Sequence, residues 1–196
     1  MKIGVFGGTF NPPHLGHVNI CREFSRHIGF DRLLIIPTFL PPHKSCQELI
    51  SPESRGEMCR IAFSEFENAE ISMTEIERKG KSYTYDTLCE IKELYPDSEI
   101  FFIMGSDMMV TFTQWYRWQD ILKLCTLCAA QRDEGNELTK YLSHFPEKVI
   151  YLPVKPFEVS STQIRNMVKK GEDISHLVGK DTAEYIKKEG LYRNVQ

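Results

Sequence analysis

The chain has 196 residues, of which 41% are hydrophobic and 26% are charged, a balance that is ordinary for a globular protein. Its formal net charge of −3 excludes the broad positive field with which a protein gathers nucleic acid or acidic membranes. No apolar run is long enough to span a bilayer, and no secretory signal follows Met1. We therefore expect a cytoplasmic protein with no nucleic-acid or membrane partner.

Apolar, strand-like runs alternate with amphipathic stretches along most of the chain. Strands are predicted over Lys2–Phe6, Arg32–Pro37, Glu70–Met73, Glu99–Met104, Cys125–Gln131 and Lys148–Leu152. Helices are predicted over Leu15–Ile28, Pro52–Phe66, Tyr85–Leu94, Tyr116–Leu124 and Asn136–Phe145. This alternation predicts an α/β, Rossmann-like, doubly wound fold, with a mostly parallel sheet and helices on both faces. Ligands of such sheets bind beyond the carboxyl ends of the strands.

Capping signals mark several expected helix ends. The candidates are Ser51 before Pro52, Ser160 with Gln163, Asp181 with Glu184, and Gly190 after Lys188. The chain contains no repeat, low-complexity segment or convincing linker. We therefore predict one domain over residues 1–196, with a short helical part from about residue 159 onward.

The first predicted strand runs into the glycine pair Gly7-Gly8 and then into two histidines, His14 and His17. Glycines allow positive φ values and lack the Cβ that would keep a phosphate away from the backbone. A helix that begins beside the histidines offers free N–H groups and a positive dipole end to an anion. Because the histidines are three residues apart, both rings project from the same face of that helix. The pattern predicts a polyphosphate site.

Two common phosphate motifs are excluded by inspection. The glycines at Gly4, Gly7 and Gly8 do not have the spacing G-x-G-x-x-G of dinucleotide-binding folds. The run Gly80–Ser82 resembles the end of a Walker A loop, but Glu75 stands where that motif needs its first glycine. A phosphate site here must be of another kind.

The six cysteines are scattered through the chain without a disulfide framework, so we expect reduced thiols. Cys125 and Cys128 form a single C-x-x-C inside an apolar run. Small core residues on a buried strand are the favoured interpretation, and a redox or zinc site is the alternative. The second C-x-x-C of a four-cysteine zinc site is missing from the sequence.

Four blocks, in order along the chain, carry a resemblance to a known family. Gly7–His17, which ends in His-Leu-Gly-His, resembles the signature of the H-x-G-H nucleotidyltransferase superfamily. Val159–Arg165 resembles the late phosphate motif of that superfamily. Glu77–Leu88, and Gly105–Asp107 followed by Trp115-Tyr116, are similar to bacterial nicotinate-nucleotide adenylyltransferases. The resemblance runs from Met1 to about Tyr192, and four ordered motifs are far more specific than one.

The resemblance implies a reaction in NAD biosynthesis. Members of the family transfer the adenylyl group of ATP to nicotinate mononucleotide and form deamido-NAD and pyrophosphate. ATP and nicotinate mononucleotide are then the expected partners, Mg²⁺ is carried with ATP, and no metal ligand is expected on the protein. The sequence is compatible with a homo-oligomer.

The resemblance also implies the site residues. The expected catalytic residues are His14, His17, Lys44 and Arg165. ATP contacts are expected from Gly7, Gly8, Thr9, Phe10, His14, His17, Gly105, Asp107, Ser160, Ser161, Thr162 and Arg165. Contacts to the nicotinate nucleotide are expected from Gly8, Thr9, Lys44, Thr84, Trp115 and Tyr116.

This chemistry needs no nucleophile from the protein, because the phosphate of the mononucleotide attacks the α-phosphorus of ATP. Catalysis then consists of positioning and of stabilising charge on the phosphates. Ser160 or Ser161 would cap a helix whose N-terminus receives the β- and γ-phosphates. Asp107 would accept both hydroxyls of the ATP ribose, and Trp115 would offer an indole face to the nicotinate ring.

Some of these residues have a second interpretation. The histidines could form a zinc pair or a helix cap, and the Ser-Ser-Thr turn could be an ordinary cap. Lys44 could be a solvated loop residue, and His43 is a weaker candidate for a phosphate contact. Asp107 could be an N-cap. Trp118 is a second candidate beside Trp115 for the nicotinate ring, and either indole could lie in the core. Two positions depart from the family pattern: Asn11 replaces the usual Asp, and Arg132 starts a segment that often reads Arg-Pro-Gly.

Other functions stay open at this point. A related nucleotidyltransferase would use nicotinamide mononucleotide or another phosphate acceptor such as phosphopantetheine. The blocks around Thr84 and Trp115 favour a pyridine nucleotide instead. A nucleotide-binding sensor without catalysis is the second alternative; His14, His17 and Arg165 argue against it, and Asn11 leaves it open. A class I aminoacyl-tRNA synthetase is excluded because the chain is too short and too little basic to embrace tRNA.

Overall fold

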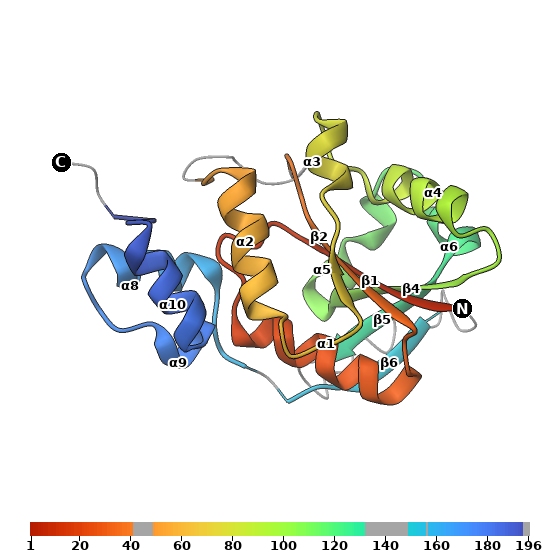
Figure 1. The fold of residues 1–196 in the computed structure, drawn as a ribbon. Coiled ribbons are helices and arrows are strands. Elements are labelled where there is room, and N and C mark those ends of the chain that lie inside the picture. Colours follow the sequence, from red (N-terminus) through yellow and green to blue (C-terminus); the bar gives the residue numbers. More distant parts are fainter. Residues whose placement is uncertain (41–48, 132–148, 156, 194–196) are drawn as a thin grey trace.

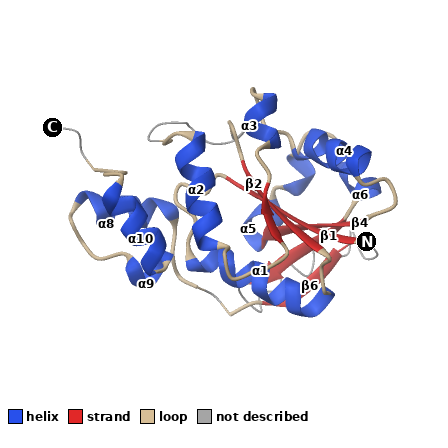
Figure 2. Ribbon diagram, viewed as in Figure 1, coloured by secondary structure: helices blue, strands red, loops and turns tan. Residues whose placement is uncertain are grey.

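Six parallel strands form one sheet in the order β3-β2-β1-β4-β5-β6 (Figure 2). The computed structural model describes residues 1–40, 49–131, 149–155 and 157–193, and for Ser106, Asp107 and Gln131 the backbone alone. The strands are β1 (Lys2–Gly8), β2 (Arg32–Pro37), β3 (Ala69–Ile71), β4 (Glu99–Gly105), β5 (Thr126–Gln131) and β6 (Val149–Pro153). All six predicted strands are present, with ends that shift by one or two residues. The α/β, doubly wound fold is confirmed.

The strand order reverses at the centre of the sheet, between β1 and β4. The chain builds β1, β2 and β3 outward in one direction and then returns to place β4 on the free side of β1. In such sheets the two halves leave a crevice beyond the carboxyl ends of the two central strands. Here β1 ends at Gly8 and β4 ends at Gly105, so this crevice is where a ligand is expected.

The strands are apolar on both faces because helices cover both faces of the sheet (Figure 1). Leu33 and Ile35 of β2 pack into one core cluster, whereas Leu34 and Ile36 pack into the other. Helices α1 (Leu15–Ile28) and α2 (Pro52–Ala62) supply the first cluster. Helices α4 (Thr84–Leu94), α5 (Ser106–Val110) and α6 (Trp118–Leu124) supply the second.

Helix predictions succeed where the apolar periodicity is long. The bounds of α1 are as predicted, and α4 begins one residue earlier than predicted. The prediction for α2 is four residues too long, because Phe63 and Phe66 pack ring to ring in a turn after the helix has ended. Helix α6 begins two residues later than predicted, after Arg117 adopts a left-handed φ of 54°. The helix expected over Asn136–Phe145 lies outside the described residues.

Three short helices and one 3₁₀ turn were not predicted. They are α3 (Thr74–Arg78), α5, α9 (Ser175–Val178) and η1 (Phe112–Gln114). None exceeds five residues, which is too short for a 3.6-residue periodicity to emerge from the sequence. None of the described helices is long and apolar enough to cross a membrane.

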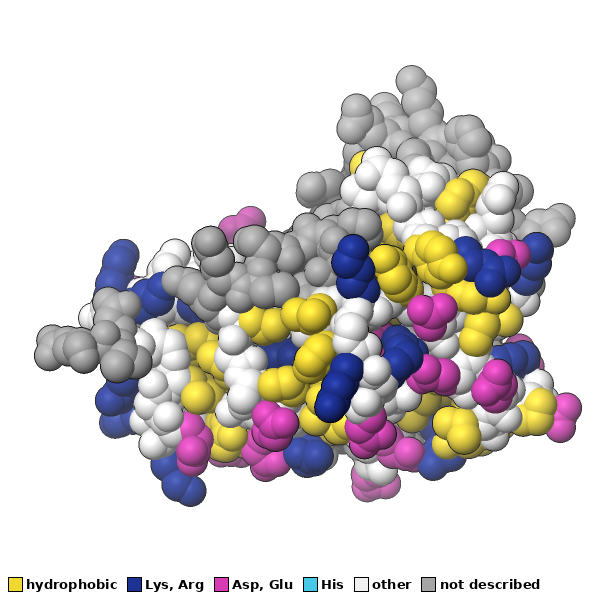
Figure 3. All heavy atoms as spheres, turned by 90° about the horizontal axis from the view of Figure 1, so that it is seen from above, with side chains coloured by type: hydrophobic (Ala, Val, Ile, Leu, Met, Phe, Trp, Pro, Cys, Tyr) yellow, Lys and Arg dark blue, Asp and Glu magenta, His cyan; other side chains and the backbone are white. Residues whose placement is uncertain are grey.

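The C-terminal helices α8 (Ser161–Lys169), α9 and α10 (Lys180–Lys188) lie beside α2, away from the sheet (Figure 1). They pack on one another and on Met58 of α2 through the buried side chains of Ile164, Ile186 and Tyr192. Figure 3 shows that Lys and Arg side chains gather at this end of the molecule. These helices form a small apolar cluster of their own, joined to the rest through α2 and through hydrogen bonds to the loop before α1.

The expected caps are mostly confirmed. The Ser51 hydroxyl accepts the Ser54 N–H at 3.1 Å, the Ser160 hydroxyl accepts the Gln163 N–H at 3.1 Å, and Gly190 follows α10 with a φ of 63°. The capping box expected from Asp181 is wrong. Gly179 is the N-cap of α10, and Asp181 lies inside the first turn, where its charge suits the positive end of the helix dipole.

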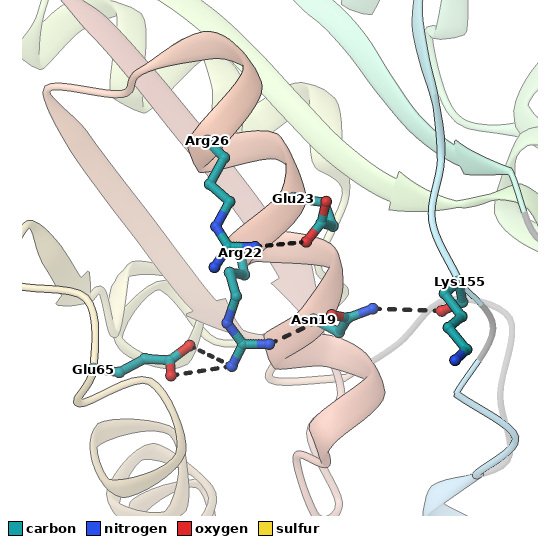
Figure 4. A network of polar contacts seen from close by, with 6 residues as sticks. All are labelled: Asn19, Arg22, Glu23, Arg26, Glu65 and Lys155. Carbon is teal, nitrogen blue, oxygen red and sulfur yellow. Dashed lines mark hydrogen bonds and ion pairs between the residues drawn. The ribbon is translucent and has the colours of Figure 1, made fainter.

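A polar network holds the solvent face of α1 in place (Figure 4). The Arg22 guanidinium donates to both carboxylate oxygens of Glu65, at 2.7 and 3.0 Å, and to the Asn19 side-chain oxygen at 3.4 Å. The Asn19 amide in turn donates to the Lys155 carbonyl at 3.4 Å. Because these side chains are largely solvated, each ion pair contributes at most about 1 kcal/mol. The network joins α1 to the segments that follow α2 and β6.

The C-x-x-C pair is structural. Cys125 packs in the cluster under α4 and α6, whereas Cys128 packs in the cluster under α1 and α2, so the two lie on opposite faces of the sheet. Neither is in a disulfide, and burial raises the pKa of Cys128 far above its ordinary value. The redox or zinc alternative is therefore excluded for this pair.

Candidate active site

A cavity of about 260 Å³ opens at the carboxyl ends of β1 and β4. The two central strands contribute Gly7, Gly8 and Gly105 to its lining. The other expected site residues in the lining are Thr9, Phe10, His17, Thr84, Trp115, Tyr116 and Ser161. Segments that are far apart in the chain therefore meet at the crevice that the strand order predicts.

The opening loop, residues 9–14, is held in an unusual backbone shape. Phe10 has a left-handed φ of 46°, and its ring is buried against Phe6, Phe63 and His17 at centroid distances of 5.5, 5.9 and 5.2 Å. A Cβ on Gly8 would lie 2.9 Å from the Phe10 ring, so a glycine is required at this close approach. Because its ring is packed in the core, Phe10 can offer a ligand only its backbone.

The two histidines are stacked at the start of α1. Their ring centroids lie 3.6 Å apart, and the His14 backbone N–H donates to His17 Nδ1 at 3.1 Å. Because Nδ1 accepts this bond, the hydrogen of a neutral His17 ring sits on Nε2. His17 lines the cavity, whereas His14 is 6% exposed, is the N-cap residue of α1 and is not in the lining. The expected shared face is confirmed, but only His17 reaches the cavity.

The Ser-Ser-Thr turn lies directly against the opening loop. The Ser161 hydroxyl donates to the Pro12 carbonyl at 2.8 Å, and Arg165 Nη1 donates to the Asn11 carbonyl at 3.0 Å. Arg165 Nη2 also donates to Thr162 Oγ1 at 3.2 Å. Ser160 and Thr162 are exposed and outside the lining, so Ser161 is the residue of this turn that lines the cavity.

Aromatic side chains line another part of the cavity. The Trp115 ring packs against Phe102 and Phe112 at centroid distances of 6.1 and 5.6 Å. Tyr116 is 51% exposed and lies over Tyr83 at 4.8 Å. Trp118 packs edge-on against Phe112 and is not in the lining, so the geometry favours Trp115 over Trp118 as the candidate platform.

For four residues named from the sequence, the structure describes no side chain. Lys44 and Arg132 lie outside the described residues, as does His43. Asp107 belongs to the first turn of α5, just beyond Gly105, and its side chain is not described. The alternative of Asp107 as the N-cap of that helix is wrong, because Gly105 is the N-cap.

A buried carboxyl that no sequence pattern indicated also lines the cavity. Glu75, in α3, is 6% exposed, and its Oε1 accepts the Thr87 hydroxyl at 2.7 Å. Burial raises the pKa of Glu75, although hydrogen bonds from Thr87 and Ser82 oppose that shift. The Ser82 hydroxyl also accepts the Phe39 N–H at 3.1 Å, which ties the turn before Thr84 to the segment after β2. A helix of five residues gave no periodic signal by which Glu75 could have been found.

The polar groups near the opening loop favour an anion over a metal ion. They are imidazole, guanidinium, hydroxyl and glycine N–H groups. Within the described ranges, no three His, Cys, Asp or Glu side chains are grouped as a metal would need.

The sheet order, the cavity and the H-x-G-H start of α1 define the class of protein. The cytidylyltransferase-like family matches residues 5–167. The nicotinate-nucleotide adenylyltransferase of Bacillus subtilis is 34% identical over 193 residues, which are 98% of this chain and 99% of that protein. The chain therefore belongs to the cytidylyltransferase-like family and, within it, to the nicotinate-nucleotide adenylyltransferases.

Solved structures agree on the fold. Two structures of the Plasmodium falciparum nicotinic acid mononucleotide adenylyltransferase, one complexed with APC and one with NaAD, both superpose with a TM-score of 0.80. Their identities to this chain are 21% and 23%, and the matches cover 97% of this chain and 96% and 97% of those chains. At this level of identity the likeness shows a shared fold.

Proposed function

We propose that this chain transfers the adenylyl group of ATP to nicotinate mononucleotide and releases pyrophosphate. The observation that carries the proposal is the junction of the opening loop with the Ser-Ser-Thr turn, at Ser161–Pro12 and Arg165–Asn11, beside the same cavity as Trp115. The named activity of the Bacillus subtilis relative supports it.

The opening loop and the turn form the phosphate side of the proposed site. His17 donates from Nε2 to a phosphate oxygen, the backbone of Gly7, Gly8 and Thr9 approaches the phosphates, and Ser161, the first residue of α8, adds its backbone N–H. His14 acts here as a positioning residue, because its N–H fixes the His17 ring. Arg165 holds the loop and adds positive charge near it. The substrate is ATP with its Mg²⁺.

Thr84, Trp115 and Tyr116 form the acceptor side of the proposed site. Trp115 stacks on the pyridine ring, and Thr84, as the first residue of α4, offers a hydroxyl and a free N–H to the nicotinate carboxylate. Gly105 makes room for the adenosine, Asp107 accepts the ribose hydroxyls, and Lys44 binds phosphate. The last two roles rest on the family resemblance.

In the proposed step, a phosphate oxygen of nicotinate mononucleotide attacks the α-phosphorus of ATP. A new phosphorus–oxygen bond forms, and the bond from the α-phosphorus to the bridging oxygen of pyrophosphate breaks. The protein contributes position and positive electrostatic potential, because both reacting groups belong to the substrates. His17 and Arg165 offset the charge that grows on the leaving pyrophosphate.

The test is pyrophosphate release by the purified chain with Mg-ATP and either nicotinate or nicotinamide mononucleotide. We expect a kcat/KM at least about tenfold higher with the acid, because converging N–H and hydroxyl donors favour a carboxylate over an amide. Equal values would remove the specificity for the acid. If the protein binds ATP but releases pyrophosphate with neither nucleotide, the alternative of a nucleotide-binding sensor without catalysis would be favoured.

A further inference from the structure

Asn11 is a point of contact between the opening loop and three distant segments. Its side chain is 6% exposed, and Oδ1 accepts the Tyr192 hydroxyl at 3.0 Å and the Ile50 N–H at 3.5 Å. Its carbonyl accepts Arg165 Nη1 at 3.0 Å. The partners come from the segment before α2, from α8 and from the chain after α10. One loop residue thus joins the cavity to the C-terminal helices.

Tyr192 is built to donate this hydrogen bond. It follows α10 with a left-handed φ of 61° and is 8% exposed within the C-terminal cluster. Burial raises the pKa of the phenol, so the hydroxyl keeps its hydrogen. Because the Ile50 N–H can only donate, the amide oxygen of Asn11 must face both groups, which makes Tyr192 a donor.

The same loop is held from beneath by a buried arginine. Arg55 of α2 is fully buried, and Nη1 donates to the Thr9 carbonyl at 3.0 Å and to the Thr38 carbonyl at 2.6 Å. Hydrogen bonds from a charged donor contribute more than neutral ones. The loop backbone is therefore fixed on both sides of Phe10, by Arg55 at Thr9 and by Tyr192 at Asn11.

We propose that Asn11 and Tyr192 are positioning residues that form a latch, through which the C-terminal helices hold the opening loop in the shape that receives the phosphates of ATP. The proposal rests on the proposed function, since it assigns phosphate binding to this loop. Neither side chain lines the cavity, so the latch acts through the backbone between Gly8 and His17. The replacement of the usual Asp by Asn11 keeps the acceptor oxygen that the latch requires.

The first test is Tyr192→Phe, with Tyr151→Phe as the matched control. Both changes remove one buried hydroxyl, but that of Tyr151 has no hydrogen-bond partner among the described residues. Losing one hydrogen bond that holds the loop corresponds to about a fivefold rise in the KM for ATP. We expect that rise for Tyr192→Phe, with the KM for nicotinate mononucleotide unchanged, and neither change for Tyr151→Phe.

The second readout is amide hydrogen exchange, which needs no turnover. Tyr192→Phe should speed exchange at the amides of Thr9–Asn11 and His14–His17 and leave α4 unchanged. If Tyr192→Phe had the KM for ATP of the wild type, the latch would be overturned. Loop amides that exchange at the wild-type rate in this variant would overturn it as well. Pyrophosphate release by the wild type is measured in the same experiment; its failure would count against the proposed function, whereas the exchange data still decide whether Tyr192 holds the loop.

A third variant separates the latch from general packing. Asn11→Asp keeps an acceptor oxygen for Tyr192 and Ile50, so its KM for ATP should stay close to that of wild type. Asn11→Leu removes this oxygen and should raise the KM for ATP at least as much as Tyr192→Phe does. Equal ATP KM values for the Asp and Leu variants would overturn the role of the acceptor oxygen.

Discussion

The two sides of the cavity are stabilised in different ways. On the phosphate side, the opening loop accepts hydrogen bonds of 2.8 to 3.0 Å from Ser161, Arg165, Tyr192 and Arg55. On the acceptor side, Trp115 and Tyr116 make ring contacts at centroid distances of 4.8 to 6.2 Å, and Tyr116 is half exposed. Hydrogen bonds fix direction, whereas ring contacts tolerate small shifts.

This contrast fits the different demands of the two substrates. The α-phosphorus must meet its attacking oxygen in line, and an error of about 1 Å there costs about 100-fold in rate. A flat pyridine ring gains from stacking over a range of offsets. We infer that losses on the phosphate side impair the use of ATP, through kcat where a group contacts the phosphates and through the KM for ATP where it only holds the loop, whereas losses on the acceptor side raise the KM for the mononucleotide.

The largest effect is expected for His17→Ala, on the phosphate side. Removing one donor to a developing negative charge lowers kcat by about 100-fold to 1000-fold. The free energy of unfolding should fall by about 2 to 3 kcal/mol, because one hydrogen bond and the ring contacts with His14, Phe10 and Phe6 are lost. Steady-state pyrophosphate release and urea unfolding measure the two quantities. His176→Ala, at an exposed position in α9, is the control, and a folded His17→Ala enzyme with normal kcat would contradict the assignment.

A smaller effect is expected on the acceptor side, from Trp115→Phe compared with Trp118→Phe. The smaller ring at residue 115 loses stacking area on the pyridine and should raise the KM for nicotinate mononucleotide about threefold to tenfold. The same change at residue 118, outside the lining, should leave that KM unchanged. The KM for ATP should be unaffected in both variants. If the two variants raised the KM for nicotinate mononucleotide equally, the role of Trp115 on the acceptor side would be contradicted.

The smallest effect is expected from Glu75→Gln, which tests the turn before Thr84. The pKa of Glu75 is raised in the folded protein. The protonated carboxyl therefore makes its full contribution to stability at pH values below the unfolded pKa of about 4.3, and that contribution is lost as the pH rises through the folded pKa. Gln cannot ionise and can still accept from Thr87. The free energy of unfolding of the variant, relative to wild type, should therefore increase from pH 4 to pH 7.

Urea unfolding at several pH values measures this difference, with Glu189→Gln at an exposed position as the control. A difference between wild type and Glu75→Gln that does not change with pH would show that burial does not penalise the Glu75 carboxylate.

The sequence predicts those parts of the molecule that depend on local pattern. The strands β1 and β4 read as apolar runs ending in glycine, and the H-x-G-H spacing places His14 and His17 on one helix face because a helix repeats every 3.6 residues. Such patterns also identify Ser160 as a cap. The two halves of the phosphate side follow from motifs, but their hydrogen bonds to each other do not.

What the sequence does not predict depends on contacts between distant segments or on very short elements. Tyr192 reaches Asn11 only because α8 to α10 pack on α2, and no local pattern records that contact. Glu75 lies on a five-residue helix, and Asp181 looked like a cap because Gly179, with its φ of 86°, carries no side-chain signal. Tertiary packing decides these positions.

The most direct test of the central claim is a crystal structure of the chain with Mg²⁺ and an ATP analogue that cannot transfer its adenylyl group. The triphosphate should lie between the His17 ring and the N-terminus of α8 at Ser161, against the backbone of Gly8 and Thr9. A triphosphate bound away from either the opening loop or the Ser-Ser-Thr turn would contradict the account.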